Sequence, residues 1–175
     1  MYNPDLHHRR SIRLKDYDYS QAGAYFVTIC THDKECLFGD IVCGEMQLNT
    51  YGQVAQNEWI KTTDIRPNVK LDYYIVMPNH FHGILTINER IGRGVLQYAP
   101  TNNILRSPSQ TIGAIVRGFK SAVTKSINVI RNTSGVPIWQ RNYYEHIIRN
   151  ETELNKIREY IINNPLNWES DENYR

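Results

Sequence analysis

The stretch Leu71-Asp-Tyr-Tyr-Ile-Val-Met-Pro-Asn-His-Phe-His-Gly-Ile-Leu-Thr-Ile87 decides the fold of this chain. Its two parts, 71–77 and 80–87, are rich in the β-branched and aromatic residues that favour strands. Only Pro78-Asn79 lies between them, and this pair of residues is typical of a turn. The stretch therefore predicts two consecutive strands joined by a tight connection.

Strand and helix patterns continue on both sides of this pair. The expected elements are a buried strand at 24–30, a weaker strand at 41–48, and helices at 50–63, at 110–129 and between Asn150 and Pro165. Asn150 with Glu153 forms a capping-box arrangement that favours the start of the last helix. This order of elements predicts an α+β fold, in which one antiparallel sheet is covered by helices.

The 175 residues are expected to form one domain spanning 1–175. A chain of this length buries about 70% of the surface that its unfolded form exposes. The segment 88–109 is rich in Gly, Pro, Asn, Ser and Arg, and we predict a mobile loop there. The three cysteines lack a CxxC spacing and are expected to be buried free thiols. Without a long apolar stretch or an apolar N-terminus, we expect a cytoplasmic protein that does not engage a membrane.

The charge is unevenly distributed along the sequence, although 20 Lys and Arg residues stand against 18 Asp and Glu residues in total. The segment 90–144 contains eight basic residues and no acidic one, which leaves 12 basic against 18 acidic residues elsewhere. Phosphates respond to such a local excess of positive charge rather than to the net charge. The pattern favours a nucleic acid as the partner.

A pair of histidines lies on the second strand of the opening stretch. Side chains alternate along a strand, so His80 and His82 point to one face and Phe81 to the other. Two neighbouring imidazoles can bind one divalent ion. Taken alone, the pair is equally compatible with two hydrogen-bonded structural histidines.

Tyr160 and Asn164 are spaced by four residues, so both project from one face of the last helix. By themselves they suit a packing tyrosine and an asparagine that ends the helix before Pro165. Together with the histidines they suggest a metal site. Two imidazoles and one amide oxygen supply three ligands to one ion and leave coordination positions open for a phosphate oxygen. A phenol needs such a metal to attack phosphorus at neutral pH.

Three motifs carry a resemblance to a known family. They are Val76-Met-Pro-Asn-His-Phe-His-Gly83, Trp139-Gln-Arg-Asn-Tyr-Tyr-Glu-His-Ile-Ile-Arg-Asn150 and Tyr160-Ile-Ile-Asn-Asn-Pro165, supported by Arg10-Ser-Ile-Arg-Leu and Tyr25-Phe-Val-Thr-Ile-Cys30. The chain resembles the HUH tyrosine transposases of single-stranded DNA, in the insertion-sequence-200-like family and its REP-associated branch. The resemblance implies a ferredoxin-like HUH nuclease sandwich.

The resemblance also implies a mechanism. His80, His82 and Asn164 would bind Mg²⁺ or Mn²⁺, and Tyr160 would be the nucleophile. Its attack would leave a 5′-phosphotyrosine link and a free 3′-hydroxyl on single-stranded DNA that carries a hairpin or repeat. Relatives act as homodimers or as monomers, and both states remain open.

Tyr144 is the reserve nucleophile, but it has Ile148 rather than a polar ligand four residues on. The residues expected to contact DNA are Arg93, Arg106, Arg117, Lys120, Lys125, Arg141 and His146. Two other functions compete with the transposase: a domesticated DNA-binding protein that no longer cleaves, and a phosphoesterase that uses metal-activated water.

Overall fold

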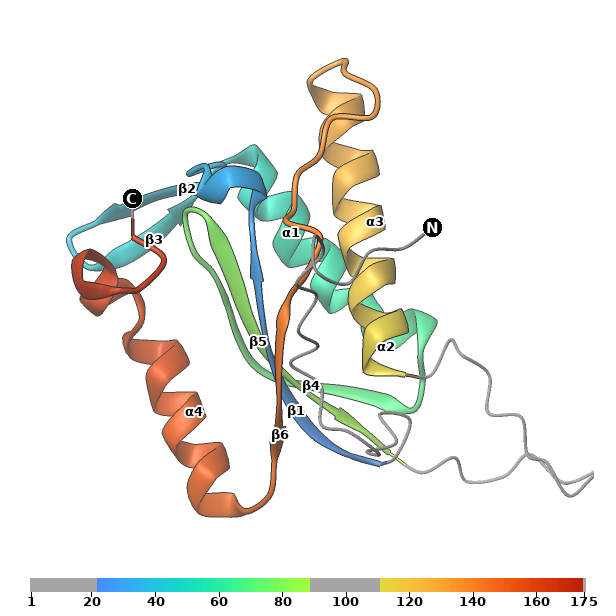
Figure 1. The fold of residues 1–175 in the computed structure, drawn as a ribbon, viewed down its shortest axis with the longest axis vertical. Coiled ribbons are helices and arrows are strands. Elements are labelled where there is room, and N and C mark those ends of the chain that lie inside the picture. Colours follow the sequence, from blue (N-terminus) through green and yellow to red (C-terminus); the bar gives the residue numbers. More distant parts are fainter. Residues whose placement is uncertain (1–21, 89–110, 175) are drawn as a thin grey trace, which may run out of the picture.

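A computed structural model describes residues 22–88 and 111–174 of the chain (Figure 1). Its centre is a four-stranded sheet in the order β4-β5-β1-β6, and each neighbouring pair is antiparallel. The strands are β1 (Gly23–Cys30), β4 (Val69–Val76), β5 (His80–Ile87) and β6 (Tyr144–Ile148). The predicted α+β class with an antiparallel sheet is therefore confirmed.

Helices cover the two faces of the sheet (Figure 1). On one face, α1 (Thr50–Ile60) and α3 (Ile112–Ile130) pack with Phe81 into the larger hydrophobic core. On the other face, α4 (Glu151–Asn163) places its apolar residues against Phe26 and Ile84. The alternation of side chains along β1 and β5 thus divides the apolar residues between two cores, one on each side of the sheet.

The helix α4 begins and ends as its sequence predicts. The side chain of Asn150 accepts a hydrogen bond from the backbone N–H of Glu153, which caps the first turn. The Glu153 carboxylate accepts one from the N–H of Arg149. Pro165 then starts the 3-10 helix η3 (Pro165–Ser170), so the chain turns back towards the sheet directly after Asn164. This turn brings the C-terminal residues beside β5.

The predicted single strand at 41–48 is wrong, because the structure forms a hairpin there. The strands β2 (Gly39–Val42) and β3 (Glu45–Leu48) pair antiparallel in a separate two-stranded sheet. Cys43 and Gly44 between them have φ values of 52° and 77°. A glycine tolerates this left-handed conformation, so the interior glycine marks a turn rather than a weak position in a strand.

Other expectations from the sequence differ in detail. The strand β6 was not predicted, and the helix expected at 50–63 is divided into α1 and the short α2 (Thr62–Ile65), while η1 (His32–Lys34) follows β1. The cysteines are free, but none is fully buried: Cys30 is half-buried, and Cys36 and Cys43 are exposed. The predicted loop at 88–109 lies, apart from Asn88, outside the described residues. Within the described ranges, no helix has both the length and the apolar character needed to cross a membrane.

Candidate active site

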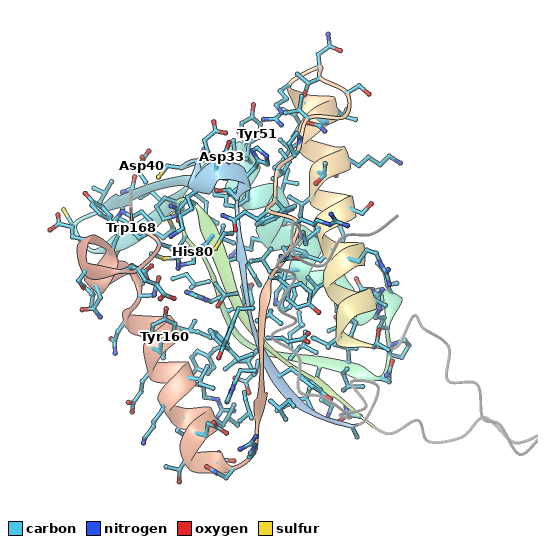
Figure 2. All side chains as sticks on the ribbon, in the orientation of Figure 1. Asp33, Asp40, Tyr51, His80, Tyr160 and Trp168 are labelled. Carbon is cyan, nitrogen blue, oxygen red and sulfur yellow. The ribbon has the colours of Figure 1, made fainter. Side chains whose placement is uncertain are left out.

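The two histidines lie on the face of the sheet that α4 covers. Their imidazole centroids are 4.5 Å apart, and both side chains are almost completely buried. Phe81 between them points to the opposite face and packs against Trp59. Figure 2 shows His80 and Tyr160 in the layer between the sheet and α4. The strand therefore presents both imidazoles to one space, as the sequence predicts.

The Nδ1 atom of each imidazole is held by a neighbouring side chain. Nδ1 of His80 lies 2.9 Å from Oδ1 of Asn79, and Nδ1 of His82 lies 2.9 Å from Oγ1 of Thr28. The remaining nitrogen of His80, Nε2, is buried without a hydrogen-bond partner. A buried imidazole nitrogen without a partner is costly unless something absent from the protein chain, such as a cation, occupies the space beside it.

Burial keeps both histidines neutral. It lowers the pKa of His80 from 6.5 to about 4, although the nearby carboxylate of Asp171 acts to raise it. Burial, together with the positive charge that His80 would carry if protonated, also lowers the pKa of His82 well below 6.5. The neutral imidazole is the form that binds a metal, so both side chains are ready to bind one at neutral pH.

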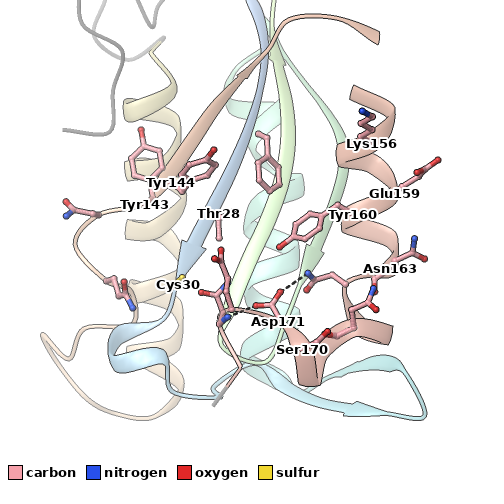
Figure 3. A pocket seen from close by; sticks show the side chains of 17 residues that line it. Thr28, Cys30, Tyr143, Tyr144, Lys156, Glu159, Tyr160, Asn163, Ser170 and Asp171 are labelled. Carbon is pink, nitrogen blue, oxygen red and sulfur yellow. Dashed lines mark hydrogen bonds between the residues drawn. The ribbon is translucent and has the colours of Figure 1, made fainter. Parts of the chain in front are cut away.

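The end of α4 brings Tyr160 and Asn164 to the histidines. The hydroxyl of Tyr160 lies 3.2 Å from Nε2 of His82. The Asn164 side chain is buried, and its Nδ2 donates to Oδ2 of Asp171 at 3.0 Å (Figure 3). Its Oδ1 has no partner. The four residues expected to form the site are thus close together in space: two come from β5, one from α4 and one is the residue that ends α4.

Asp171 is a candidate member of the site that the sequence did not reveal. One potential ligand atom from each of His80, His82 and Asp171 lies within 4.8 Å of the other two. Two imidazoles with amide and carboxylate oxygens form a mixed nitrogen and oxygen donor set that suits a divalent cation. Asp171 follows η3, and nothing in the local pattern around it marks a ligand, because its position depends on the turn at Pro165.

The phenol of Tyr160 loses its proton less readily here than in water. Burial, followed by the negative charges of Asp171 and Glu172, raises its pKa from 10.0 to about 12. The side chain is nevertheless 42% exposed, because it faces a cleft. A reaction that uses the phenolate therefore needs a nearby positive charge to stabilise it.

The cleft has a volume of about 970 Å³ and runs between α4 with the C-terminal segment and the strands β1 and β6 (Figure 3). Phe26 and Tyr144 contribute aromatic surface, and Lys156 contributes positive charge, one helical turn before Tyr160. The volume of the cleft is much larger than the space that a metal ion needs, so the cleft has room for an extended ligand.

The expected DNA contacts are distributed over several places. Arg117 and Lys125 are exposed on α3, in the layer on the other side of the sheet from the cleft. The Lys120 ammonium donates to the backbone oxygens of Gln140 and Arg141, at 2.6 and 3.1 Å, and so ties α3 to that segment. Arg141 itself is exposed. Arg93 and Arg106 lie outside the described residues.

Two further expected residues lie on β6. Nε2 of His146 is 2.7 Å from Oε1 of Glu153, so this histidine joins β6 to the first turn of α4. Tyr144 lines the cleft and is 49% exposed, with its ring edge-on to Phe26 at a centroid distance of 6.4 Å. The tyrosine hydroxyl in contact with a candidate metal-binding histidine is that of Tyr160 and not that of Tyr144.

Comparisons with known proteins agree with this fold. No family model matches the sequence. An uncharacterized protein of Haemophilus influenzae is 47% identical over 176 residues, which are 99% of this chain and 97% of that protein. A putative REP-associated tyrosine transposase of the same organism is 24% identical over 151 residues, covering 85% of this chain and 73% of that protein.

A solved structure of a REP-associated tyrosine transposase bound to a REP hairpin superposes with a TM-score of 0.59, at 22% identity. The superposition covers 90% of this chain and 73% of that one. The chain thus has a transposase fold. Within that class, the resemblance to the REP-associated tyrosine transposases is confirmed by both the curated relative and the solved structure.

Proposed function

We propose that this protein is a metal-dependent, transposase-like endonuclease and strand transferase for single-stranded DNA. His80, His82 and Asn164, joined by Asp171, hold Mg²⁺ or Mn²⁺, and Tyr160 is the nucleophile. One observation carries the proposal: the Tyr160 hydroxyl lies 3.2 Å from Nε2 of His82, beside two buried acceptor atoms that have no partner. Buried acceptors in a purely structural site normally have a hydrogen-bond partner.

The reaction is a transfer of one phosphodiester bond. A divalent cation held by His80, His82, Asn164 and Asp171 would supply Lewis-acid polarisation of the phosphoryl group and would stabilise the negative charge of the transition state. The Tyr160 oxygen gives up its proton and bonds to phosphorus, while the bond from phosphorus to the 3′ oxygen breaks. The departing oxygen takes up a proton, which leaves a free 3′-hydroxyl and a 5′-phosphotyrosine. Attack by another 3′-hydroxyl then rejoins a strand without an external energy source.

The cleft supplies the surface for a single strand. Bases stack on exposed aromatic rings whatever their sequence, and Tyr144, which is backed by the buried Phe26, offers such a ring. Lys156 lies where it can contact a backbone phosphate next to Tyr160. Because the structural neighbour is bound to a REP hairpin, we propose hairpin or repeat DNA as the substrate of this chain.

Trapping of the covalent intermediate tests this function. Incubating the protein with a hairpin-bearing single strand and Mn²⁺ should give an adduct that survives denaturation. Tyr160→Phe should abolish this adduct, whereas the matched variant Tyr144→Phe should retain it. An adduct formed by Tyr160→Phe would refute the assignment of the nucleophile.

Two other outcomes of the same experiment identify the competing functions. Cleaved DNA without an adduct in the wild-type protein would indicate a phosphoesterase that uses activated water. Binding without cleavage, with either Mg²⁺ or Mn²⁺, would indicate a DNA-binding protein that has lost transposase chemistry.

A further inference from the structure

Asn79, in the turn before β5, has a fixed amide orientation. Its Nδ2 donates to two backbone oxygens, that of Lys34 at 3.2 Å and that of Asn173 at 2.7 Å. Carbonyl oxygens only accept hydrogen bonds, so the nitrogen end of the amide must face them. The oxygen end therefore faces Nδ1 of His80 at 2.9 Å. The side chain is fully buried, and water does not compete for these bonds.

The orientation of Asn79 determines where His80 carries its proton. An amide oxygen only accepts, so Nδ1 of His80 must be the donor. A neutral imidazole has a single N–H, which leaves the lone pair on Nε2. That atom is buried and has no partner in the protein chain. The hydrogen bond thus aims a free lone pair at the space between β5 and α4.

Asn164 is oriented by the same logic from the opposite side. Its Nδ2 donates to the carboxylate of Asp171, which only accepts, so Oδ1 must point away from that carboxylate. Oδ1 is also buried without a partner. Two acceptors are therefore left without donors in one site, an arrangement that suits a cation.

The C-terminal residues that orient these amides are themselves held in place. The backbone N–H of Asn173 donates to Oδ1 of Asp171 at 2.6 Å, which closes a tight turn. Nζ of Lys34 donates to the backbone oxygen of Glu172 at 2.9 Å, and the Cys30 thiol donates to Oδ1 of Asn173 at 3.5 Å. The segment 171–173 thus connects η1, β1 and the end of α4.

We propose that the segment 171–173 is a positioning element that presets the metal donors: through Asn79 it fixes the Nδ1–H tautomer of His80, and through Asp171 it aims Oδ1 of Asn164. This inference rests on the metal-dependent function proposed above and specifies how its site is organised. Asn79 and Asn173 act through His80 and are positioning residues. His82 differs, because its partners Thr28 and Tyr160 are hydroxyls that can donate or accept.

The tautomer of His80 can be measured directly in the metal-free full chain. Long-range proton–nitrogen correlation spectra of histidine-labelled protein distinguish the Nδ1–H form from the Nε2–H form, and a His80→Gln spectrum assigns the signals. We expect Nδ1–H for His80 in the wild type. Asn79→Ala should shift His80 towards Nε2–H and weaken Mn²⁺ binding, measured by electron paramagnetic resonance, by roughly 10- to 100-fold.

Asn128→Ala is the matched control, because Asn128 is a buried asparagine that holds the backbone oxygen of Val136 at the far end of α3. It should leave the His80 tautomer and the Mn²⁺ affinity unchanged. A chain that ends at Ser170 provides a second test if Asn79→Ala does not fold. It should shift His80 towards the Nε2–H form in the same way. An Nε2–H form of His80 in the wild type, or an unchanged tautomer in these variants, would overturn the proposal. Neither readout depends on DNA cleavage, so failure of the proposed reaction is a separate result.

Discussion

The hydroxyl of Tyr160 lies 3.2 Å from Nε2 of His82, the same nitrogen that would bind a metal in this site. One ring nitrogen cannot hydrogen-bond to a phenol hydroxyl, as donor or as acceptor, and bind a cation at the same time. Binding of a cation at Nε2 would therefore displace the hydroxyl from His82 and leave it free beside the new positive charge. The arrangement links loading of the site to the release of its proposed nucleophile.

Metal binding should stabilise the fold and depend on Asp171. At Mn²⁺ concentrations near 100 times the dissociation constant, we expect about 2.7 kcal/mol of stabilisation, or roughly 5 to 11 °C in Tm for a chain of this size. Asp171→Asn should reduce this shift, because it removes the negative charge and one of the two oxygens that accept from the Asn164 amide and from the Asn173 backbone N–H. Asp64→Asn, an exposed carboxylate on α2, is the control in differential scanning calorimetry. Equal shifts in both variants would exclude Asp171 from the site.

Local patterns in the sequence predicted the candidate site residues that belong to regular elements. Strand alternation placed His80 and His82 on one face, and helical spacing placed Tyr160 with Asn164. That the two pairs meet could not be deduced from either pattern. It depends on α4 crossing the face of the sheet opposite α1 and α3, and only the family resemblance indicated this.

The parts of the site that the sequence missed depend on tertiary contacts. Asp171 and Asn173 reach the histidines because η3 reverses the chain after Asn164. The strand β6 was missed because Glu145 and His146 interrupt its apolar pattern. Glu145 is nevertheless buried, since its carboxylate accepts a hydrogen bond from Tyr143 at 2.6 Å. Such polar pairs become visible only when their partners are in place.

Tyr144 is expected to bind DNA by its ring rather than to react through its hydroxyl. In a Tyr160→Phe background, Tyr144→Ala should weaken binding of a single strand by about 1 to 3 kcal/mol, the range for loss of one stacked base. Tyr144→Phe keeps the ring and should retain the affinity in fluorescence anisotropy. If Tyr144→Ala binds as tightly as Tyr144→Phe, the strand does not stack on this wall of the cleft.

Salt dependence can show which cations contact the backbone of the DNA. Lys156→Ala should reduce the slope of log K against log salt by about 0.7, the value for one phosphate contact on a single strand. Lys61→Ala removes a cation that is paired with Glu58 and should leave the slope unchanged. Arg117→Ala tests the sequence-based prediction for α3: a similar loss of slope would mean that the strand extends past the sheet edge. An unchanged slope in Lys156→Ala would mean that the side chains contacting the phosphates lie outside the cleft.

The buried histidines should make the metal-free protein sensitive to mild acid. The folded-state pKa of His80, about 4, lies below its ordinary value of 6.5, so the unfolded chain takes up the proton first as the pH falls. Stability is therefore full above about pH 6.5, declines below it and levels off near pH 4, where the folded form also becomes protonated. Between about pH 7.5 and pH 5.5, protonation of His80 in the unfolded chain should lower the unfolding free energy by about 1 kcal/mol, and His82, whose pKa is lowered too, should add a loss in the same direction. Urea unfolding in the presence of a chelator measures this difference. The double variant His80→Gln with His82→Gln should flatten the dependence. A wild-type protein equally stable at both pH values would show that the two imidazoles are not buried in their neutral form.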